Sequence, residues 1–165
     1  MAAVTVAFSF KQRFRFPAAD VYRWATDYTP HDIGLLGKQG RRGIARLNDD
    51  TLVLTDTFVA PDGTKVTKKK LIRLYPGSLR WINTHVSGPN LHSQFVYELF
   101  DDGSRGSYLL FTGRQIVQRD GITPKELKSL TRTVKSEDAG MWKSLAKAIA
   151  ADLGANTKEK KKKKK

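Results

Sequence analysis

Residues 123–154 read TPKELKSLTRTVKSEDAGMWKSLAKAIAADLG, and this stretch decides the fold. Thr123 and Glu126 have the spacing of a capping box, and Pro124 suits the first position of a helix. Apolar residues then recur at helical intervals, which is the pattern of one buried helical face. The stretch therefore predicts a helix of about 30 residues, roughly 45 Å long, that ends near Gly154.

The N-terminal segment is predicted to be a long strand with one apolar face. Pro17 ends this strand and can start a helix, so we expect a short helix over residues 18–27. A second short helix is expected over residues 31–36, after Pro30. In the strand, apolar side chains occupy every second position except at Gln12; they are Val4, Val6, Phe8, Phe10, Phe14 and Phe16.

Between the two helical regions, turn signals separate six β-rich segments. The signals include Asn48-Asp49-Asp50, Pro61-Asp62-Gly63 and Gly88-Pro89-Asn90. The segments are residues 43–47, 51–59, 65–75, 79–86, 92–100 and 107–117. We therefore expect an α+β fold in which a seven-stranded antiparallel sheet wraps around the long C-terminal helix, because only that helix is long enough to cover the dry face. A curved sheet around a helix tends to leave a cavity between them.

This order of elements resembles the helix-grip fold of the START-like superfamily. The superfamily, also called SRPBCC, includes Bet v 1-like and polyketide cyclase/dehydrase-like proteins. The resemblance covers nearly all of residues 3–154 and is carried by residues 14–24, FRFPAADVYRW, by Leu74-Tyr75-Pro76-Gly77, and by the last helix with Trp142 and Leu145. It implies a pocket for a hydrophobic or amphipathic small molecule, lipid-like or polyketide-like, and does not identify that molecule.

Composition narrows the classes of function. The absence of cysteine excludes disulfides, thiol nucleophiles and zinc–thiolate sites. No apolar run approaches the roughly 20 residues of a membrane span. The first charge, Lys11, follows an apolar stretch, which is the reverse of a secretory signal. We expect a cytoplasmic protein with one domain over residues 1–154, without a cofactor or a metal.

The C-terminal residues 155–165 are predicted to be a disordered, lysine-rich tail. Seven lysines against Glu159 lie between Lys158 and Lys165, so the tail carries +6 of the net charge of +14 and leaves about +8 on the body. Such a run can attract nucleic acid or an anionic lipid surface without specificity. The alternative is a tail that only increases solubility.

We expect the cavity to be lined by aromatic and apolar side chains with a few polar ends. Plain core packing is the alternative for each of these residues. Arg80 and Arg114 could fix an acidic group of a ligand, or be surface charges. The expected lining consists of Trp81, Asn83, Phe95, Tyr97, Tyr108, Leu110, Met141, Trp142 and Leu145.

Three residues are weak candidates for acid–base catalysis: Asp56, His85 and Tyr97. Either face of the strand over residues 51–59 could be the inner one; a buried Asp56 would have a raised pKa, but we favour an exposed Asp56 because unpaired buried acids are rare. His85 and His92 would face each other if the loop between them has two or four residues, and would part otherwise. We favour ordinary rim histidines over a metal site there, and expect His31 to start a helix.

Gly37, Gly40 and Gly43 enclose three basic residues. This segment resembles the glycine-rich loop of Bet v 1-type proteins, which would make it an anion-binding loop. It precedes a strand rather than opening a helix, so we favour a flexible, basic entry into the second strand.

Three functional hypotheses follow. The first is a binding protein that holds a hydrophobic or amphipathic small molecule between sheet and helix. The second is a cyclase/dehydrase-type enzyme on the same fold. The third is a nucleic-acid-associated protein, which stacked aromatic residues on an open sheet would support.

Overall fold

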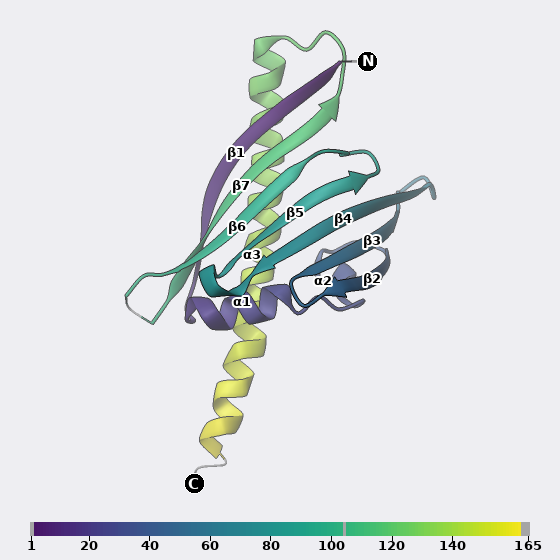
Figure 1. The fold of residues 1–165 in the computed structure, drawn as a ribbon. Helices are drawn as coiled ribbons and strands as arrows, with labels where there is room; N and C mark the ends of the chain where they lie inside the picture. The colour runs from purple at the N-terminus through teal and green to yellow at the C-terminus, as the bar shows by residue number, and fades with distance from the viewer. Residues whose placement is uncertain (1, 104, 163–165) are drawn as a thin grey trace.

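The fold of the protein is built on one antiparallel sheet. A computed structural model describes residues 2–103 and 105–162. Its seven strands are joined in the order β1-β7-β6-β5-β4-β3-β2 (Figure 1). Each strand from β2 to β6 pairs with the next one along the chain, and β1 completes the sheet by pairing with β7. The strands are β1 (Ala3–Phe14), β2 (Gly40–Asn48), β3 (Thr51–Val59), β4 (Lys65–Tyr75), β5 (Arg80–Ser87), β6 (Gln94–Asp101) and β7 (Ser107–Gln118).

Three α-helices accompany the sheet in the described part of the chain: α1 (Ala18–Thr26), α2 (Asp32–Leu35) and α3 (Pro124–Lys162). In Figure 1, α3 runs behind the sheet, so the sheet face toward the viewer carries no helix. We call the face toward α3 the inner face and the opposite one the outer face. The predicted α+β class, the seven strands and the two short helices are confirmed.

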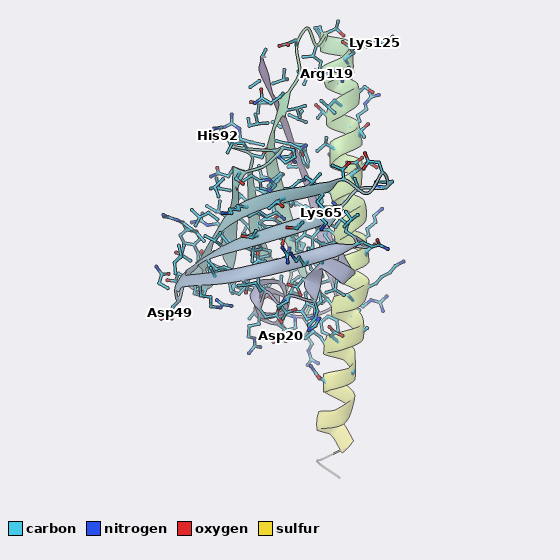
Figure 2. All side chains as sticks on the ribbon, turned by 90° about the vertical axis from the view of Figure 1, so that its right-hand side faces the viewer. Asp20, Asp49, Lys65, His92, Arg119 and Lys125 are labelled. Atoms are coloured by element: carbon cyan, nitrogen blue, oxygen red, sulfur yellow. The ribbon has the colours of Figure 1, made fainter. Side chains whose placement is uncertain are left out.

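The long helix begins where the sequence predicts and ends later. The Thr123 hydroxyl accepts a hydrogen bond from the Glu126 backbone N–H at 3.2 Å, and the Glu126 carboxylate accepts one from the Thr123 N–H at 2.8 Å. The expected end at Gly154 is wrong, because the helix continues to Lys162. Its 39 residues span about 58 Å, and Figure 2 shows it continuing well past α1, where Asp20 is labelled.

This extension also bears on the predicted tail. Residues 155–162, expected to lack regular structure, continue the helix instead. Residues 163–165 and the side chains from Thr157 onward lie outside the described part of the structure. The division into a domain of residues 1–154 and a separate tail therefore stays a prediction.

The core lies between the inner face and α3. Along β1 the predicted alternation holds, with Val6, Phe8 and Phe14 buried, and with Ala7, Ser9, Lys11 and Arg13 exposed. They pack with Phe111 of β7 and with Trp142 of α3. The core also includes Val134 and Ile149 from α3, which are 7% and 0% exposed, so the helix is held along several turns.

The connection from β1 into α1 is fixed by two hydrogen bonds. The buried Ser107 hydroxyl donates to the Phe16 carbonyl at 2.7 Å, and the Ala18 N–H donates to the Asp101 carboxylate at 2.8 Å. The carboxylate satisfies a free N–H in the first turn of α1, which a proline at the N-cap cannot do. These bonds hold α1 across one end of the sheet, where it closes one side of the site described next.

Candidate functional site

A cavity of about 370 Å³ lies among the inner face, α3 and the α1–α2 segment. Strands β2 to β6 form its floor, α3 forms one wall, and residues from Trp24 to Leu36 form the other. This is the volume of a small-molecule site. The cavity therefore occupies the place that the sequence predicts for a ligand.

One wall of the cavity is apolar and rich in aromatic rings. Trp81 of β5 stacks on Tyr97 of β6, directly opposite in the sheet, with ring centroids 4.6 Å apart and an interplanar angle of 1°. The Trp142 ring of α3 lies 6.3 Å from Trp81 and 5.8 Å from Tyr97. The other apolar lining residues are Trp24, Ala25, Leu35, Leu36, Leu54, Met141 and Leu145.

The polar part of the lining, called the polar wall below, rests on a buried ion-pair cluster. Asp56 of β3 is fully buried, and Arg42 lies directly opposite it on β2. Two guanidinium nitrogens of Arg42 donate to the two Asp56 oxygens, at 2.7 and 2.9 Å. Lys70 of β4 donates to Asp56 at 2.9 Å, and Arg42 also reaches Asp32 at 3.2 Å. The two cations and two carboxylates balance one another.

The cluster fixes the charge state of its members. Burial alone would raise the pKa of Asp56, but the hydrogen bonds and charges of Arg42 and Lys70 bring that pKa below its usual value. Burial lowers the pKa of Lys70, and its contact with Asp56 opposes this shift. Asp56 is thus an ionised partner of two cations. It is not a general acid.

Two tyrosine hydroxyl groups border the cavity near both parts of its lining. Burial raises the pKa of both Tyr28 and Tyr97, so both stay protonated at neutral pH. A hydrogen bond from Asn83 to Tyr97 opposes the second shift. Tyr28 follows α1 with a positive φ of 35°, and its ring faces the Arg42 guanidinium at 6.0 Å. Tyr28, Tyr97 and Asn83 all line the cavity.

The rim of the cavity is formed by α1, α2 and the C-terminal half of α3. The Trp24 indole N–H donates to the Asp152 carboxylate at 2.8 Å and so connects α1 to α3. Thr29 donates to Asp32 from both its backbone N–H and its hydroxyl, each at 2.8 Å, which fixes the segment before α2 to the first residue of that helix. Burial, with the charges of Asp32 and Asp152, raises the pKa of Asp27 beside them.

Comparison with solved structures identifies the fold. The chain superimposes on the aromatase/cyclase Zhui from Streptomyces sp. R1128 with a TM-score of 0.73 and 14% identity, covering 91% of this chain and 96% of that one. For Ara h 8.0201 the TM-score is 0.68 and the identity 17%, over 90% and 99% of the two chains. The fold is the START-like helix-grip fold.

A third structure with this fold is norcoclaurine synthase from Thalictrum flavum, in complex with dopamine and hydroxybenzaldehyde. The TM-score is 0.67 and the identity 14%, over 90% of this chain and 88% of that one. No protein-family model and no curated protein matches the sequence. At these identities the likeness establishes the helix-grip fold, and the chemistry has to be argued from the site itself.

Six of the nine residues expected in the lining do border the cavity: Trp81, Asn83, Tyr97, Met141, Trp142 and Leu145. Phe95 is buried on the inner face but packs between His85 and Phe111 in the core. Tyr108 and Leu110 were placed on the wrong face of β7. Both lie on the outer face, because Leu109 and Phe111 are the buried residues of that strand.

The acid–base candidates lie in three different environments. The expected exposure of Asp56 is wrong: it is fully buried, because Arg42 and Lys70 neutralise it. His85 is buried outside the cavity lining, and burial together with Lys70 and Lys68 lowers its pKa to about 4. Tyr97 alone of the three borders the cavity.

The histidines do not form a pair. The His85 N–H donates to the Ser93 carbonyl and the His92 N–H donates to the His85 carbonyl, each at 2.9 Å, but the His85 residue is buried whereas His92 is exposed. Among the described residues, no group of three or more His, Asp or Glu side chains could hold a metal ion. His31 precedes α2 and borders the cavity.

The glycine-rich segment is mostly strand. Gly40 and Gly43 lie in β2, and a side chain at Gly40 would collide with the Thr57 carbonyl, so this segment is a close strand contact. Its residue Arg42 was not predicted to face the site. Counting back from the turn at Asn48 would have placed Gly43 opposite Asp56, because a register shift between Arg46 and Asn48 brings Arg42 to that position instead. Arg80 and Arg114 lie on the outer face, away from the cavity.

The described helices include none that is both long enough and apolar enough to cross a membrane.

Proposed function

We propose that the protein binds an amphipathic small molecule in the cavity between the inner face and α3. The observation that carries this proposal is the cavity of about 370 Å³ whose lining is divided between an aromatic wall and a polar wall. Burial of apolar ligand surface contributes about 25 cal/mol per Å², so each 100 Å² covered adds about 2.5 kcal/mol of binding free energy. The apolar body of the ligand would rest against Trp81 and Trp142.

The polar wall favours a neutral polar group over a carboxylate. Arg42 and Lys70 are already neutralised by Asp56 and Asp32, so an added anion would compete with carboxylates held at hydrogen-bond distance. The protonated phenols of Tyr28 and Tyr97 can each donate one hydrogen bond and accept another. A ligand hydroxyl or carbonyl group fits these partners.

The test is the uptake of a neutral apolar probe, N-phenyl-1-naphthylamine, followed by its fluorescence. Leu145→Trp fills the cavity from α3 and should weaken probe binding at least about tenfold, since the bound probe and the new ring need the same space. Leu130→Trp is the matched control, because Leu130 is half-buried on α3 outside the cavity lining. Equal probe binding by both variants and the wild type would contradict the proposal.

The natural ligand can be sought directly. We expect an organic extract of the natively purified protein to contain a small amphipathic molecule, detected by mass spectrometry, that is depleted in extracts of Leu145→Trp. An empty extract combined with no probe uptake would count against a binding role.

A cyclisation or dehydration enzyme is the second candidate, favoured by one observation. Tyr97 and Tyr28, which stay protonated, border the cavity together with the cation Lys70. Phenol donors near a ligand carbonyl can stabilise the oxyanion of an enolate that forms during ring closure. A model substrate is heptane-2,4,6-trione, which loses one water to give orcinol. Tyr97→Phe should then abolish orcinol formation and retain probe binding; retained formation would exclude this role for Tyr97.

Location and the role of the tail remain proposals. We propose a cytoplasmic location, supported by the absence of cysteine in the sequence. Lysines 158 and 160–165 would hold the protein near anionic surfaces by charge alone.

A further inference from the structure

The outer face of the sheet is basic and uncovered. Alternation along the strands places eight basic side chains and one acidic side chain, Glu98, on this face. For Lys69, Arg73 and Arg114, the structure records no ion pair with any acidic residue in its described part. The eight are Lys11, Arg13, Arg41, Lys65, Lys69, Arg73, Arg80 and Arg114.

An aromatic pair lies on the same face. Phe100 of β6 lies directly opposite Tyr108 of β7, with ring centroids 5.3 Å apart and an interplanar angle of 27°. The Lys11 ammonium lies 4.8 Å from the centre of the Tyr108 ring. Phe100 is 41% exposed, so part of its ring is open to a ligand from solvent.

We propose that the outer face binds single-stranded nucleic acid. Lysine and arginine side chains spread over a sheet neutralise successive phosphates, and an exposed aromatic platform stacks with unpaired bases. Open sheets that bind single-stranded RNA use this combination of exposed rings and flanking cations. The face supplies both parts from β-strand residues, independently of the C-terminal lysines.

A lipid surface fits this face less well. The apolar side chains Val53, Leu71 and Ile82 are half-buried between their neighbours. The exposed Val59 and Val86 lie on β3 and β5, which β4 separates, so the exposed apolar side chains are dispersed rather than gathered in one wedge that could enter hydrocarbon. Threonines surround them instead, among them Thr57 and Thr67, whose hydroxyls lie 3.1 Å apart. Such hydroxyls can donate to phosphate oxygens. A second copy of the chain is disfavoured because two basic faces repel each other.

The proposal is tested by fluorescence anisotropy with a labelled oligouridine of about 12 nucleotides, titrated with the full-length protein at several salt concentrations. Lys69→Glu/Arg73→Glu should weaken binding at least about tenfold and reduce the salt dependence, because phosphate contacts are lost. Lys143→Glu/Lys147→Glu, at exposed positions of α3, changes the net charge equally and should weaken binding far less. Equal losses in the two variants would overturn the proposal.

The aromatic pair gives a second, charge-neutral test. Phe100→Leu should weaken binding about tenfold, while Phe100→Tyr, which keeps the ring, should bind as the wild type does. Equal affinity of Phe100→Leu and the wild type would overturn the stacking role. Thermal unfolding of each variant checks that the fold is intact.

Two further experiments distinguish the outer face from the lysine tail, and nucleic acid from a lipid surface. Replacing Lys160 to Lys165 with glutamine should leave most of the oligonucleotide affinity in place; loss of binding in this variant would assign it to the tail and overturn the proposal. Sedimentation of this glutamine variant with phosphatidylserine-containing vesicles should be weak at physiological salt, because the lysines proposed to attract anionic surfaces have been removed. Vesicle binding that depends on Lys69 and Arg73, without oligonucleotide binding, would identify a lipid surface instead.

Discussion

Basic side chains have opposite environments on the two faces of the sheet. On β4, Lys69 points to the outer face and is exposed, while its neighbour Lys70 points inward, is nine-tenths covered and donates to Asp56 at 2.9 Å. On the inner face, the cations Arg42 and Lys70 are paired with carboxylates. On the outer face, cations greatly outnumber acids.

This difference follows from solvation. A charge removed from water is tolerated only with a partner and hydrogen bonds, so Arg42 and Lys70 require Asp56. A charge left in water needs no partner, so Lys69 and Arg73 remain available to an external anion. One sheet can therefore present a balanced, closed site on one side and an open electrostatic surface on the other. The predictions below test this contrast, beginning with the largest effect.

Asp56→Asn should cause the largest loss of stability. It leaves Arg42 and Lys70 buried without their shared counter-charge, which costs about 3–5 kcal/mol of the free energy of unfolding. Urea denaturation measures the loss. The outer-face control is Glu98→Gln, which should change stability by less than about 1 kcal/mol. Similar values for the two variants would show that the inner acid is not needed to balance its cations.

Leu109 and Leu110 form a matched pair, since they are adjacent in β7 and face opposite ways. Leu109 is fully buried, so Leu109→Ala should cost about 2–5 kcal/mol through lost burial and the cavity left behind. Leu110→Ala on the outer face should cost about 1 kcal/mol or less, because the site is half-exposed. Urea midpoints compare them; an equal or larger loss for Leu110 would mean that the outer face is covered in solution.

The inner face should also make stability depend on pH. Burial, aided by Lys70 and Lys68, lowers the pKa of His85 from 6.5 to about 4, so between these values the unfolded chain takes up a proton that the folded chain refuses. Stability therefore falls as the pH decreases through this window, by up to about 3 kcal/mol. His85→Gln should lose less stability than the wild type between pH 7 and pH 4.5, with His92→Gln as the matched control.

Asp138 acts in the opposite direction in the same window. Burial and the charge of Glu137 raise the pKa of Asp138 from 3.8 to about 6. As the pH decreases, this carboxyl group takes up its proton in the folded chain before it does so in the unfolded chain, so the folded state gains stability between pH 6 and pH 3.8. Asp138→Asn should therefore be more sensitive to acid than the wild type. Identical pH profiles for the wild type, His85→Gln and Asp138→Asn would contradict both burial effects.

The smallest expected effect concerns the outer face alone. Because its cations repel one another, Arg73→Gln should increase the free energy of unfolding by a few tenths of a kcal/mol at low ionic strength. The gain should vanish near 0.5 M salt, where the Debye length is only a few Å. A salt-independent change would mean that Arg73 acts through packing.

The sequence predicts the architecture well because its signals are local. Alternation in β1, turn residues between the strands and the capping box at Thr123 each act within a few residues, and each recurs in the structure. The end of α3 was wrong because a glycine and a lysine run weaken a helix without forbidding it. The helix-grip topology then follows, since only α3 can cover the sheet.

The faces of individual strands could not be predicted so well. Strand β7 has apolar residues on both sides, so alternation alone does not distinguish Tyr108 and Leu110 from Leu109 and Phe111. Strand β3 has the same ambiguity, and the burial of Asp56 depends on Arg42 and Lys70 from two other strands. Such partners are set by register between distant segments, which a local pattern does not contain.

All three tryptophans of the chain, Trp24, Trp81 and Trp142, border the cavity. The aromatic residues of the outer face are phenylalanine and tyrosine only. We therefore expect a ligand that binds there to leave the indole emission unchanged. Tryptophan fluorescence is consequently a reporter of ligand binding in the cavity. A shift in emission on adding a compound assigns that compound to the interior, and a silent titration with bound oligonucleotide assigns the oligonucleotide to the exterior.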